Sequence, residues 1–112
     1  VVCIVGDGSA VYNLQALWTQ ARLNLPVVTI ILANRSYATL FGEMAATGAN
    51  AGPVAEALFD LGNPALDWRS LARGFGVEAV RAETVEGFAA QFRAGLAGGG
   101  PMLIEAVLSG AG

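Results

Sequence analysis

The sequence predicts an α/β fold in three layers, an open parallel sheet with helices on both of its faces. Short apolar runs rich in β-branched residues alternate with segments whose apolar residues recur at helical spacing. Glycine, proline or a polar residue separates these segments from one another. Because strands separated by helices are joined by right-handed crossovers, the strands are expected to run parallel and to be covered on both faces.

The first part of the chain predicts a strand, a helix and a second strand. Residues 1–5 (VVCIV) are continuously apolar, which is typical of a strand buried on both faces, and Cys3 is expected to be a buried, unreactive thiol. A helix is expected over residues 9–24, and Pro26 ends it because proline cannot continue a helix. Its apolar residues at helical spacing are Leu14, Leu17, Trp18, Ala21 and Leu25. Residues 27–32 (VVTIIL) predict the second buried strand.

The middle of the chain is expected to hold two short helical segments around a loop. Residues 38–46 predict a short helix, and residues 47–53 (TGANAGP) have the composition of a loop. Residues 54–61 are expected to add a helical turn. Asp67 then caps a helix through Arg73, which stops at Gly74 or Gly76.

The last part of the chain predicts two strands on either side of a helix. Residues 77–82 form the third expected strand and residues 102–108 (MLIEAVL) the fourth. Between them, Thr84 caps a helix that reaches about Ala97. The apolar face of this helix is expected to carry Val85, Phe88, Ala89, Phe92 and Leu96.

Composition indicates one domain of a larger protein. The chain has 112 residues, a length that fits one domain or part of one, and only 13% of them are charged. This is about half of the usual ~25%, so part of the surface is expected to pack against protein. The chain opens on Val1 within an apolar run. We therefore expect residues 1–112 to be a domain of a longer, multidomain chain, truncated at its N-terminus.

Several functional classes are excluded by residue counts. The chain has no His, so it holds neither a Ser-His-Asp triad nor a His-ligated metal, and its single Cys excludes an internal disulfide. The net charge of −3 argues against nucleic acid as a partner. Apolar runs fall short of the ~20 residues that span a bilayer, and no signal peptide is visible, so a cytoplasmic protein is expected.

Two polar loops follow the first two expected strands, at the ends where open parallel sheets bind ligands. Gly6-Asp7-Gly8-Ser9 leaves the first strand, and Asn34-Arg35-Ser36 leaves the second. A glycine-rich loop that enters a helix suits a phosphate group, because its free N–H groups approach the anion closely. It is not a Walker A loop, since the Lys-Ser/Thr pair is missing. It is not a dinucleotide fingerprint either, since Val11 replaces a required glycine.

Asp7 would repel a phosphate unless a divalent cation lies between them. Asp7 offers a carboxylate oxygen, Asn34 an amide oxygen and the chain near Ser36 a carbonyl, which together suit Mg²⁺. The alternative is that Asp7 caps the helix and Asn34 makes an Asx turn. That alternative explains either residue alone better than it explains the pair.

Gly6-Asp7-Gly8, followed after 25 residues by Asn34, resembles the cofactor motif of thiamin-diphosphate-dependent enzymes. The resemblance covers nearly the whole chain, and it is strongest for the acetolactate synthase and benzoylformate decarboxylase branch. Three stretches support it, GDGSAVYNLQALWTQARLNLPVVTIILANRSYATL, DWRSLARGFGVEAVRA and GPMLIEAVL. The implied fold is the domain that binds the diphosphate of the cofactor.

The resemblance also implies roles for individual residues. It makes the side chains of Asp7 and Asn34 ligands of Mg²⁺, with the Ser36 carbonyl as the third. The cofactor diphosphate would be bound at Gly6, Gly8 and Ser9, with Tyr37 beside it or packed under the loop. Leu40 and Glu43 follow where relatives line the substrate pocket, and Phe41 fits ordinary helix packing better.

Two residues depart from the family pattern. Many relatives have Asn-Asn where this chain has Ala33-Asn34, and Arg35 replaces a residue that is often Gly or Asn. Arg35 could contact an acidic substrate or phosphate, or it could be a solvated loop charge. Neither change removes a proposed metal ligand, but both leave the substrate class open.

The implied activity is decarboxylation and carboligation of 2-oxo acids by an acetolactate-synthase-like enzyme, with thiamin diphosphate and Mg²⁺ as cofactors. One alternative is a benzoylformate-type decarboxylase, and another is a non-catalytic fragment that keeps the fold for subunit association. The Glu that activates the cofactor lies on another domain in the family, so this domain alone is expected to be inactive. The expected assembly is a homodimer or homotetramer.

Overall fold

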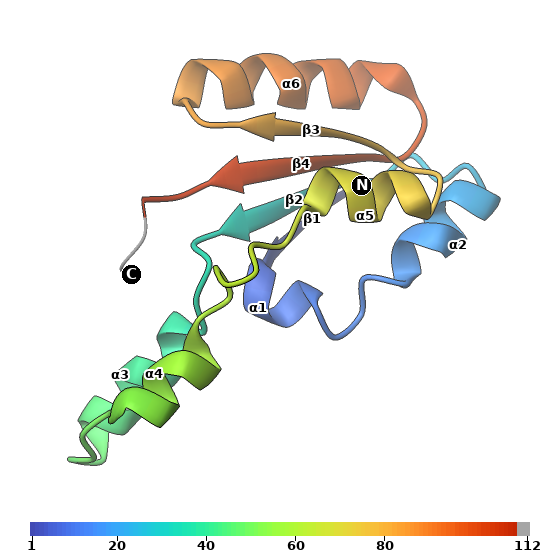
Figure 1. The fold of residues 1–112 in the computed structure, drawn as a ribbon. Helices are drawn as coiled ribbons and strands as arrows, with labels where there is room; N and C mark the ends of the chain where they lie inside the picture. The colour runs from blue at the N-terminus through green and yellow to red at the C-terminus, as the bar shows by residue number, and fades with distance from the viewer. Residues whose placement is uncertain (110–112) are drawn as a thin grey trace.

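Four parallel strands form a single sheet in the order β1-β2-β4-β3, with helices on both sides (Figure 1). The computed structural model describes residues 1–109. Its strands are β1 (Val2–Gly6), β2 (Val28–Ala33), β3 (Glu78–Ala82) and β4 (Met102–Val107). Every pairing in the sheet is parallel, which confirms the predicted fold class.

Two apolar cores lie on opposite faces of the sheet because successive side chains of a strand point to opposite sides. Ile31 and Leu103 belong to the core under α1 (Asp7–Ala10), α2 (Ala16–Arg22) and α5 (Trp68–Gly74). Their neighbours Ile30 and Ile104 belong to the core under α6 (Val85–Gly98). The sheet is therefore the middle of three layers, as predicted.

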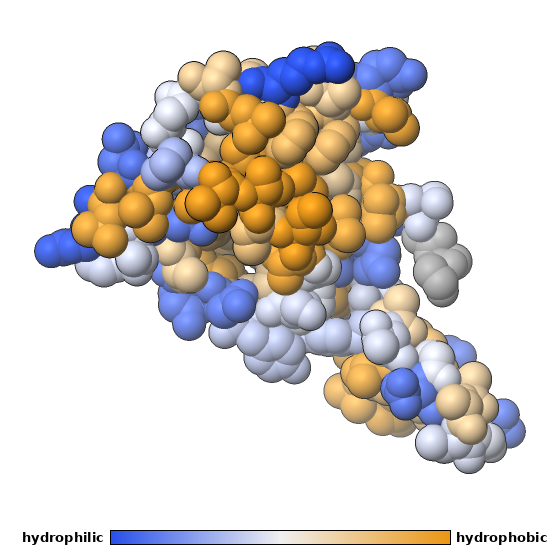
Figure 2. Space-filling model, turned by 180° about the vertical axis from the view of Figure 1, so that it is seen from behind, coloured by the Kyte–Doolittle hydropathy of each residue, from blue (hydrophilic) through white to orange (hydrophobic). Residues whose placement is uncertain are grey.

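Strand β1 is exposed, and the prediction that it is buried on both faces is wrong. It lies at the edge of the sheet, where β2 is its neighbour. Val2 and Ile4 are 42% and 64% exposed, and Cys3 is an exposed free thiol. Helix α6 packs on β2, β3 and β4. The face of the molecule that Figure 1 hides carries a broad apolar patch in Figure 2.

The single helix predicted over residues 9–24 is two short helices, which corrects that prediction. Helix α1 ends at Ala10 and α2 begins at Ala16. Between them the amide groups bond to the carbonyl three residues earlier, as in Asn13 to Ala10 at 3.1 Å. Turns of this kind repeat every three residues, so the apolar spacing of one turn does not separate them from an α-helix. Trp18 is half-exposed, with the Arg22 guanidinium 5.1 Å from its ring centre.

Helices α3 (Ala38–Ala46) and α4 (Pro53–Phe59) form an arm that projects from the sheet (Figure 1). The predicted helix over residues 38–46 and the loop after it are confirmed, and α4 begins slightly before its expected position with proline in its first turn. Phe41 packs edge-to-face on Phe59, with ring centres 4.9 Å apart. This contact confirms the packing role expected of Phe41.

The C-terminal elements follow their predicted signals closely. Asp67 accepts a hydrogen bond from the Ser70 amide, and Thr84 accepts one from the Gly87 amide, so both predicted caps are present.

The predicted apolar face of α6 is partly wrong. Phe88 and Phe92 pack on the sheet, whereas Val85 and Leu96 are 79% and 54% exposed. No helix within residues 1–109 is long and apolar enough to cross a membrane.

Candidate functional site

The two polar loops meet at the carboxyl ends of β1 and β2. Gly6 is in register with Leu32, so Asp7 and Asn34 leave adjacent strands at the same edge, as expected for neighbouring strands. A cavity of about 660 Å³ opens there. Its lining comes from α1, the 34–37 loop, the arm and the end of β4 and includes Gly6, Asp7, Gly8, Ser9, Tyr12, Leu32, Asn34, Ser36, Tyr37, Ala38, Thr39, Leu40, Leu58, Phe59 and Leu108.

Asp7 is a buried carboxylate that joins the two loops. It is 3% exposed, and its Oδ1 accepts a hydrogen bond from the Gly8 amide at 2.9 Å. Its Oδ2 accepts one from the Arg35 amide at 2.7 Å. The Asp7 carboxylate forms no ion pair with a basic side chain among residues 1–109. Since each carboxylate oxygen accepts more than one hydrogen bond, both keep a lone pair for a further partner.

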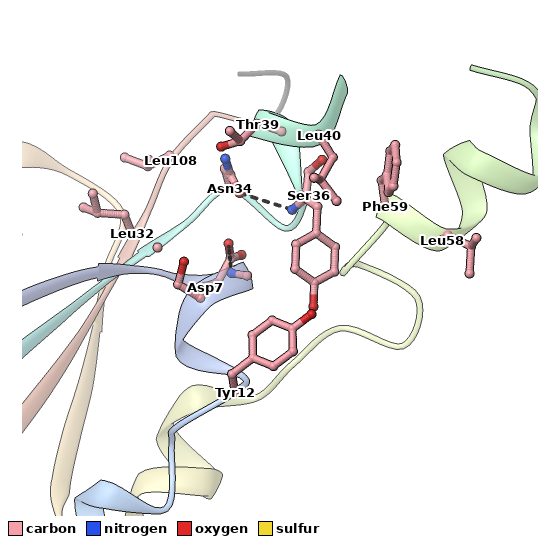
Figure 3. Close-up of a pocket in the computed structure, with 15 residues that line it drawn as sticks. Asp7, Tyr12, Leu32, Asn34, Ser36, Thr39, Leu40, Leu58, Phe59 and Leu108 are labelled. Atoms are coloured by element: carbon pink, nitrogen blue, oxygen red, sulfur yellow. Dashed lines mark hydrogen bonds between the residues drawn. The ribbon is translucent and has the colours of Figure 1, made fainter. Parts of the chain in front are cut away.

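Asn34 lies above Asp7 in the same opening (Figure 3). Its Oδ1 accepts a hydrogen bond from the Ser36 amide at 3.2 Å, which is the Asx turn considered from the sequence. That turn uses one of two lone pairs on Oδ1, so the turn and a metal-ligand role are compatible. The described residues contain no cluster of three or more His, Cys, Asp or Glu side chains suited to a metal. A cation here would therefore depend on one carboxylate and on neutral oxygens.

Arg35 is placed by its backbone rather than by its charge. Its φ of 60° lies in the left-handed region, which directs its amide to Asp7. Its guanidinium donates to the Leu108 carbonyl at the end of β4, at 3.4 Å. Arg35 does not line the cavity. Gly and Asn adopt a positive φ more easily than Arg does, so this position carries local strain.

The 34–37 loop is hydrogen bonded to the end of α4 and the residues that follow it. The Tyr37 amide donates to the Phe59 carbonyl at 2.8 Å, and the Leu61 amide donates to the Arg35 carbonyl at 2.9 Å. The Tyr37 ring lies on Gly8, where a Cβ atom would be 2.7 Å from Cδ1. Position 8 therefore requires glycine while the ring stays in place. The neighbouring Tyr12 side chain and partial burial raise the pKa of the Tyr37 phenol.

The structure brings all of the predicted site residues into one cavity except Glu43, which lies outside its lining. Sequence reasoning did not single out Tyr12, Leu32, Thr39, Leu58, Phe59 or Leu108, which also line it. Tyr12 follows Asp7 closely along the chain and could have been found as part of the first turns after the loop. The others depend on the position of the arm and on the order of β2 and β4, which require the assembled fold.

Comparison with known proteins then identifies the family. Residues 1–106 match the model of the thiamine pyrophosphate enzyme C-terminal TPP binding domain. This chain belongs to that family. The chain is 44% identical over 110 residues to the acetolactate synthase large subunit-like protein IlvX of Mycobacterium tuberculosis, covering 96% of this chain and 21% of that protein. It is 39% identical over 105 residues to benzoylformate decarboxylase of Pseudomonas aeruginosa, covering 94% of this chain and 19% of that protein.

Solved structures of thiamin-diphosphate-dependent enzymes share the fold. A 4-hydroxybenzoylformate decarboxylase from Rhodococcus jostii matches with a TM-score of 0.88 and 36% identity, over 99% of this chain and 20% of that one. Benzoylformate decarboxylase of Polynucleobacter necessarius matches with a TM-score of 0.87 at 23% identity, over 97% of this chain and 19% of that one, which supports the fold alone. This TPP binding domain thus spans about a fifth of the length of its relatives.

The donor groups of this TPP binding domain fit a magnesium diphosphate. Asp7 is a buried anion held by two backbone amides, and a buried carboxylate is costly unless it is paired or binds a metal. The available ligand atoms are a carboxylate, an amide oxygen and carbonyls, and oxygen ligands are those that Mg²⁺ prefers. A cation at Asp7 would also remove the repulsion between this carboxylate and a bound diphosphate.

Proposed function

We propose that the cavity at the ends of β1 and β2 binds Mg²⁺ and the diphosphate of thiamin diphosphate. Asp7 and Asn34 supply side-chain oxygens to the metal, and the Ser36 carbonyl supplies a third ligand. The observation that carries this proposal is the buried Asp7 carboxylate, which spans both loops without a basic partner among residues 1–109. A divalent cation supplies the missing positive charge.

The loop from Gly6 to Ser9 takes the diphosphate in this proposal. Gly6, Gly8 and Ser9 line the cavity and Tyr37 lies against Gly8, and the Ser9 hydroxyl and the free backbone amides of this loop would donate to the phosphates. Backbone N–H groups that converge on one point bind phosphate oxygens without reorganising. Two backbone hydrogen bonds join the 34–37 loop to residues 59–61, and the bond from the Arg35 amide to Asp7 joins it to the Gly6–Ser9 loop.

Thiamin diphosphate supplies carbanion chemistry when bound, and through it the complete enzyme would decarboxylate a 2-oxo acid. The residues of this domain anchor the cofactor and neutralise its diphosphate. Leu40 lies on the cavity wall and Glu43 does not, so a substrate role is proposed for Leu40 alone. The similarity to an acetolactate-synthase-like protein favours a carboligase. Similarity to two decarboxylases of benzoylformate type supports the second candidate.

The proposed setting is a complete, cytoplasmic enzyme in which residues 1–112 form the diphosphate-binding domain. This domain packs against the other domains of the same enzyme, as expected of a family whose members are about five times as long. Its assembly is proposed to be a homodimer or homotetramer. If the complete enzyme binds the cofactor but turns over neither pyruvate nor benzoylformate, the role in subunit association is favoured instead.

Replacement of Asp7 tests the proposed function. In the full-length enzyme, Asp7→Ala is expected to weaken thiamin diphosphate binding in the presence of Mg²⁺ by at least about a hundredfold, because metal and diphosphate are lost together. Titration calorimetry with and without Mg²⁺ measures this. The matched control is Glu56→Ala, which removes an exposed carboxylate of α4 and should leave the affinity unchanged. Equal affinities of Asp7→Ala and the unaltered enzyme would refute the proposal.

A further inference from the structure

The arm formed by α3 and α4 joins the rest of the domain at its base, where Ser36 and Asp60 form an antiparallel bridge. Beyond the base the two helices pack mainly on each other, and none of their residues is buried. Helices of nine and seven residues are too short to be stable in isolation. The arm therefore depends on apolar packing, of which the contact between Phe41 and Phe59 supplies a part.

The arm exposes an apolar patch, which we define as Leu40, Val54 and Leu58. These side chains are 42%, 75% and 69% exposed. Val54 and Leu58 are four residues apart, so they share one face of α4, and Leu40 and Leu58 line the same cavity. Figure 2 shows apolar residues between polar ones on the projecting arm. Large apolar side chains gathered on a projection without buried residues indicate a contact surface.

The arm also carries the whole net charge of the chain. Residues 36–66 contain Glu43, Glu56 and Asp60 and neither Lys nor Arg. The other six acidic residues are balanced by six arginines, so the rest of the chain is neutral. An acidic surface repels nucleic acid and the anionic headgroups of membranes. The partner that covers the apolar patch is therefore expected to be a protein with basic residues.

The position of the arm favours a partner beyond its own domain. The structure measures 47 Å along its longest axis against 29 and 23 Å, and the arm projects from the sheet at one end (Figure 1). Contact between the arms of two copies would bring two acidic surfaces together, which like-charge repulsion disfavours. In a symmetric assembly, the arm of one copy would instead meet a different, basic surface of the other.

We propose that the arm docks on a second subunit of the same enzyme, at a surface with an apolar centre and Lys or Arg at its rim. The contact buries Val54 and Leu58. Glu43 follows Leu40 by three residues on α3, so it borders the patch and pairs with a basic side chain of the other subunit. This inference rests on the homo-oligomer of the proposed function and assigns a surface to it.

Val54→Asp tests the apolar centre in the full-length enzyme, since Val54 does not line the cavity. A charge buried there should raise the dissociation constant of the oligomer at least about thirtyfold, as measured by analytical ultracentrifugation. Val85→Asp is the matched control, because Val85 is a valine of similar exposure, 79%, on α6. Equal weakening in both variants would overturn the assignment to the arm. An unchanged oligomer with a lower melting temperature would place the arm on its own subunit and also overturn it.

Glu43→Arg tests the basic rim without touching the apolar centre. The variant should dissociate about fivefold more readily at low salt, and higher salt should narrow the difference because it screens exposed charges. Glu56→Arg makes the same change two residues from both Val54 and Leu58, hence on the opposite face of α4, and should leave the oligomer unaltered. Unchanged or tighter association of Glu43→Arg would overturn the proposal.

The two tests separate this proposal from the proposed function. If Val54→Asp does not fold, Glu43→Arg decides in its place, because it alters an exposed side chain. A full-length enzyme that is monomeric at every concentration would overturn the docking of the arm. These measurements use the cofactor-free enzyme, whereas the proposed function depends on the effect of Mg²⁺ and Asp7 on cofactor affinity, so either can fail without the other.

Discussion

Asp7 and Glu105 are two carboxylates that the sheet buries to a similar degree, at 3% and 7% exposure, in different surroundings. Asp7 lies just beyond the end of β1 and accepts hydrogen bonds from the amides of Gly8 and Arg35. Glu105 lies within β4, in register with Ile31 on one side and Arg81 on the other. Arg81 is ion-paired with Glu83 at 3.1 Å, and burial raises the pKa of Glu105.

The surroundings of the two carboxylates differ in a way that fits the role proposed for Asp7. Backbone amides solvate the Asp7 carboxylate and leave lone pairs facing a cavity, so the anion is prepared for a cation. Around Glu105, removal from water favours the neutral acid, and the nearby Arg81 opposes this in part. Burial alone therefore does not distinguish the proposed ligand Asp7 from Glu105, whereas backbone donors and an adjoining cavity do.

Gly8→Ala tests the Asp7 half of the comparison and should have the largest effect, because it disturbs the loop that carries Asp7. The new Cβ would lie 2.7 Å and 2.9 Å from two ring atoms of Tyr37, so the ring or the loop must move. Overpacking of this kind costs about 1–3 kcal/mol, and the affinity for thiamin diphosphate should fall at least about tenfold. Calorimetry and thermal unfolding of the full-length enzyme measure the two effects. Gly42→Ala is the control, since its Cβ meets nothing within 4 Å; similar losses in both variants would contradict the expectation.

Glu105→Gln tests the Glu105 half of the comparison, and it should change the stability of the protein but not its cofactor binding. The pKa of Glu105 is higher in the folded protein than in the unfolded chain, so the folded state binds more protons between these two values. The unaltered protein therefore loses stability as the pH rises from about 4 through the raised pKa, and Gln removes this loss. The melting temperatures of the variant and the unaltered protein should be similar at pH 4, and the variant should melt higher than the unaltered protein at pH 7. Unaltered cofactor affinity is expected; a variant that melts lower at pH 7 would contradict the account.

Arg35→Gly should have the smallest effect, because the group that donates to Asp7 is the backbone amide of residue 35, which glycine retains. Glycine adopts a φ of 60° without strain, and the amide still donates to Asp7. Arg35→Ala keeps the strain and also lacks the guanidinium, so the pair of variants isolates the backbone term. The glycine variant is expected to be more stable than the alanine variant by about 1 kcal/mol in thermal unfolding. Equal stabilities would show that this loop is not strained.

Local signals account for what the sequence predicted well. The caps at Asp67 and Thr84 and the loops at Asp7 and Asn34 depend on residues within a few positions of each other. The two loops were expected to face each other if the first two strands are neighbours, and β1 and β2 are paired in the sheet. These features therefore needed no knowledge of the distant chain.

What the sequence did not predict depends on distant partners. The five apolar residues of β1 have the composition of a central strand, but the sheet places them at its edge. Phe59 reaches the cavity because α4 pairs with α3. Glu105 sits inside an apolar run, and its pKa is raised by residues that surround β4 in the assembled fold. None of these follows from spacing along the chain.

The central claim is that Asp7 and Asn34 hold a divalent cation together, and one measurement tests it most directly. Crystals of the full-length enzyme grown with thiamin diphosphate and Mn²⁺, which binds oxygen ligands as Mg²⁺ does, would locate the metal by its anomalous scattering. The account predicts a single peak at roughly 2.1–2.2 Å from an Asp7 carboxylate oxygen and from the Asn34 amide oxygen, with the Ser36 carbonyl beside it. Bound cofactor with no metal peak at Asp7, or a peak at other residues, would contradict the account.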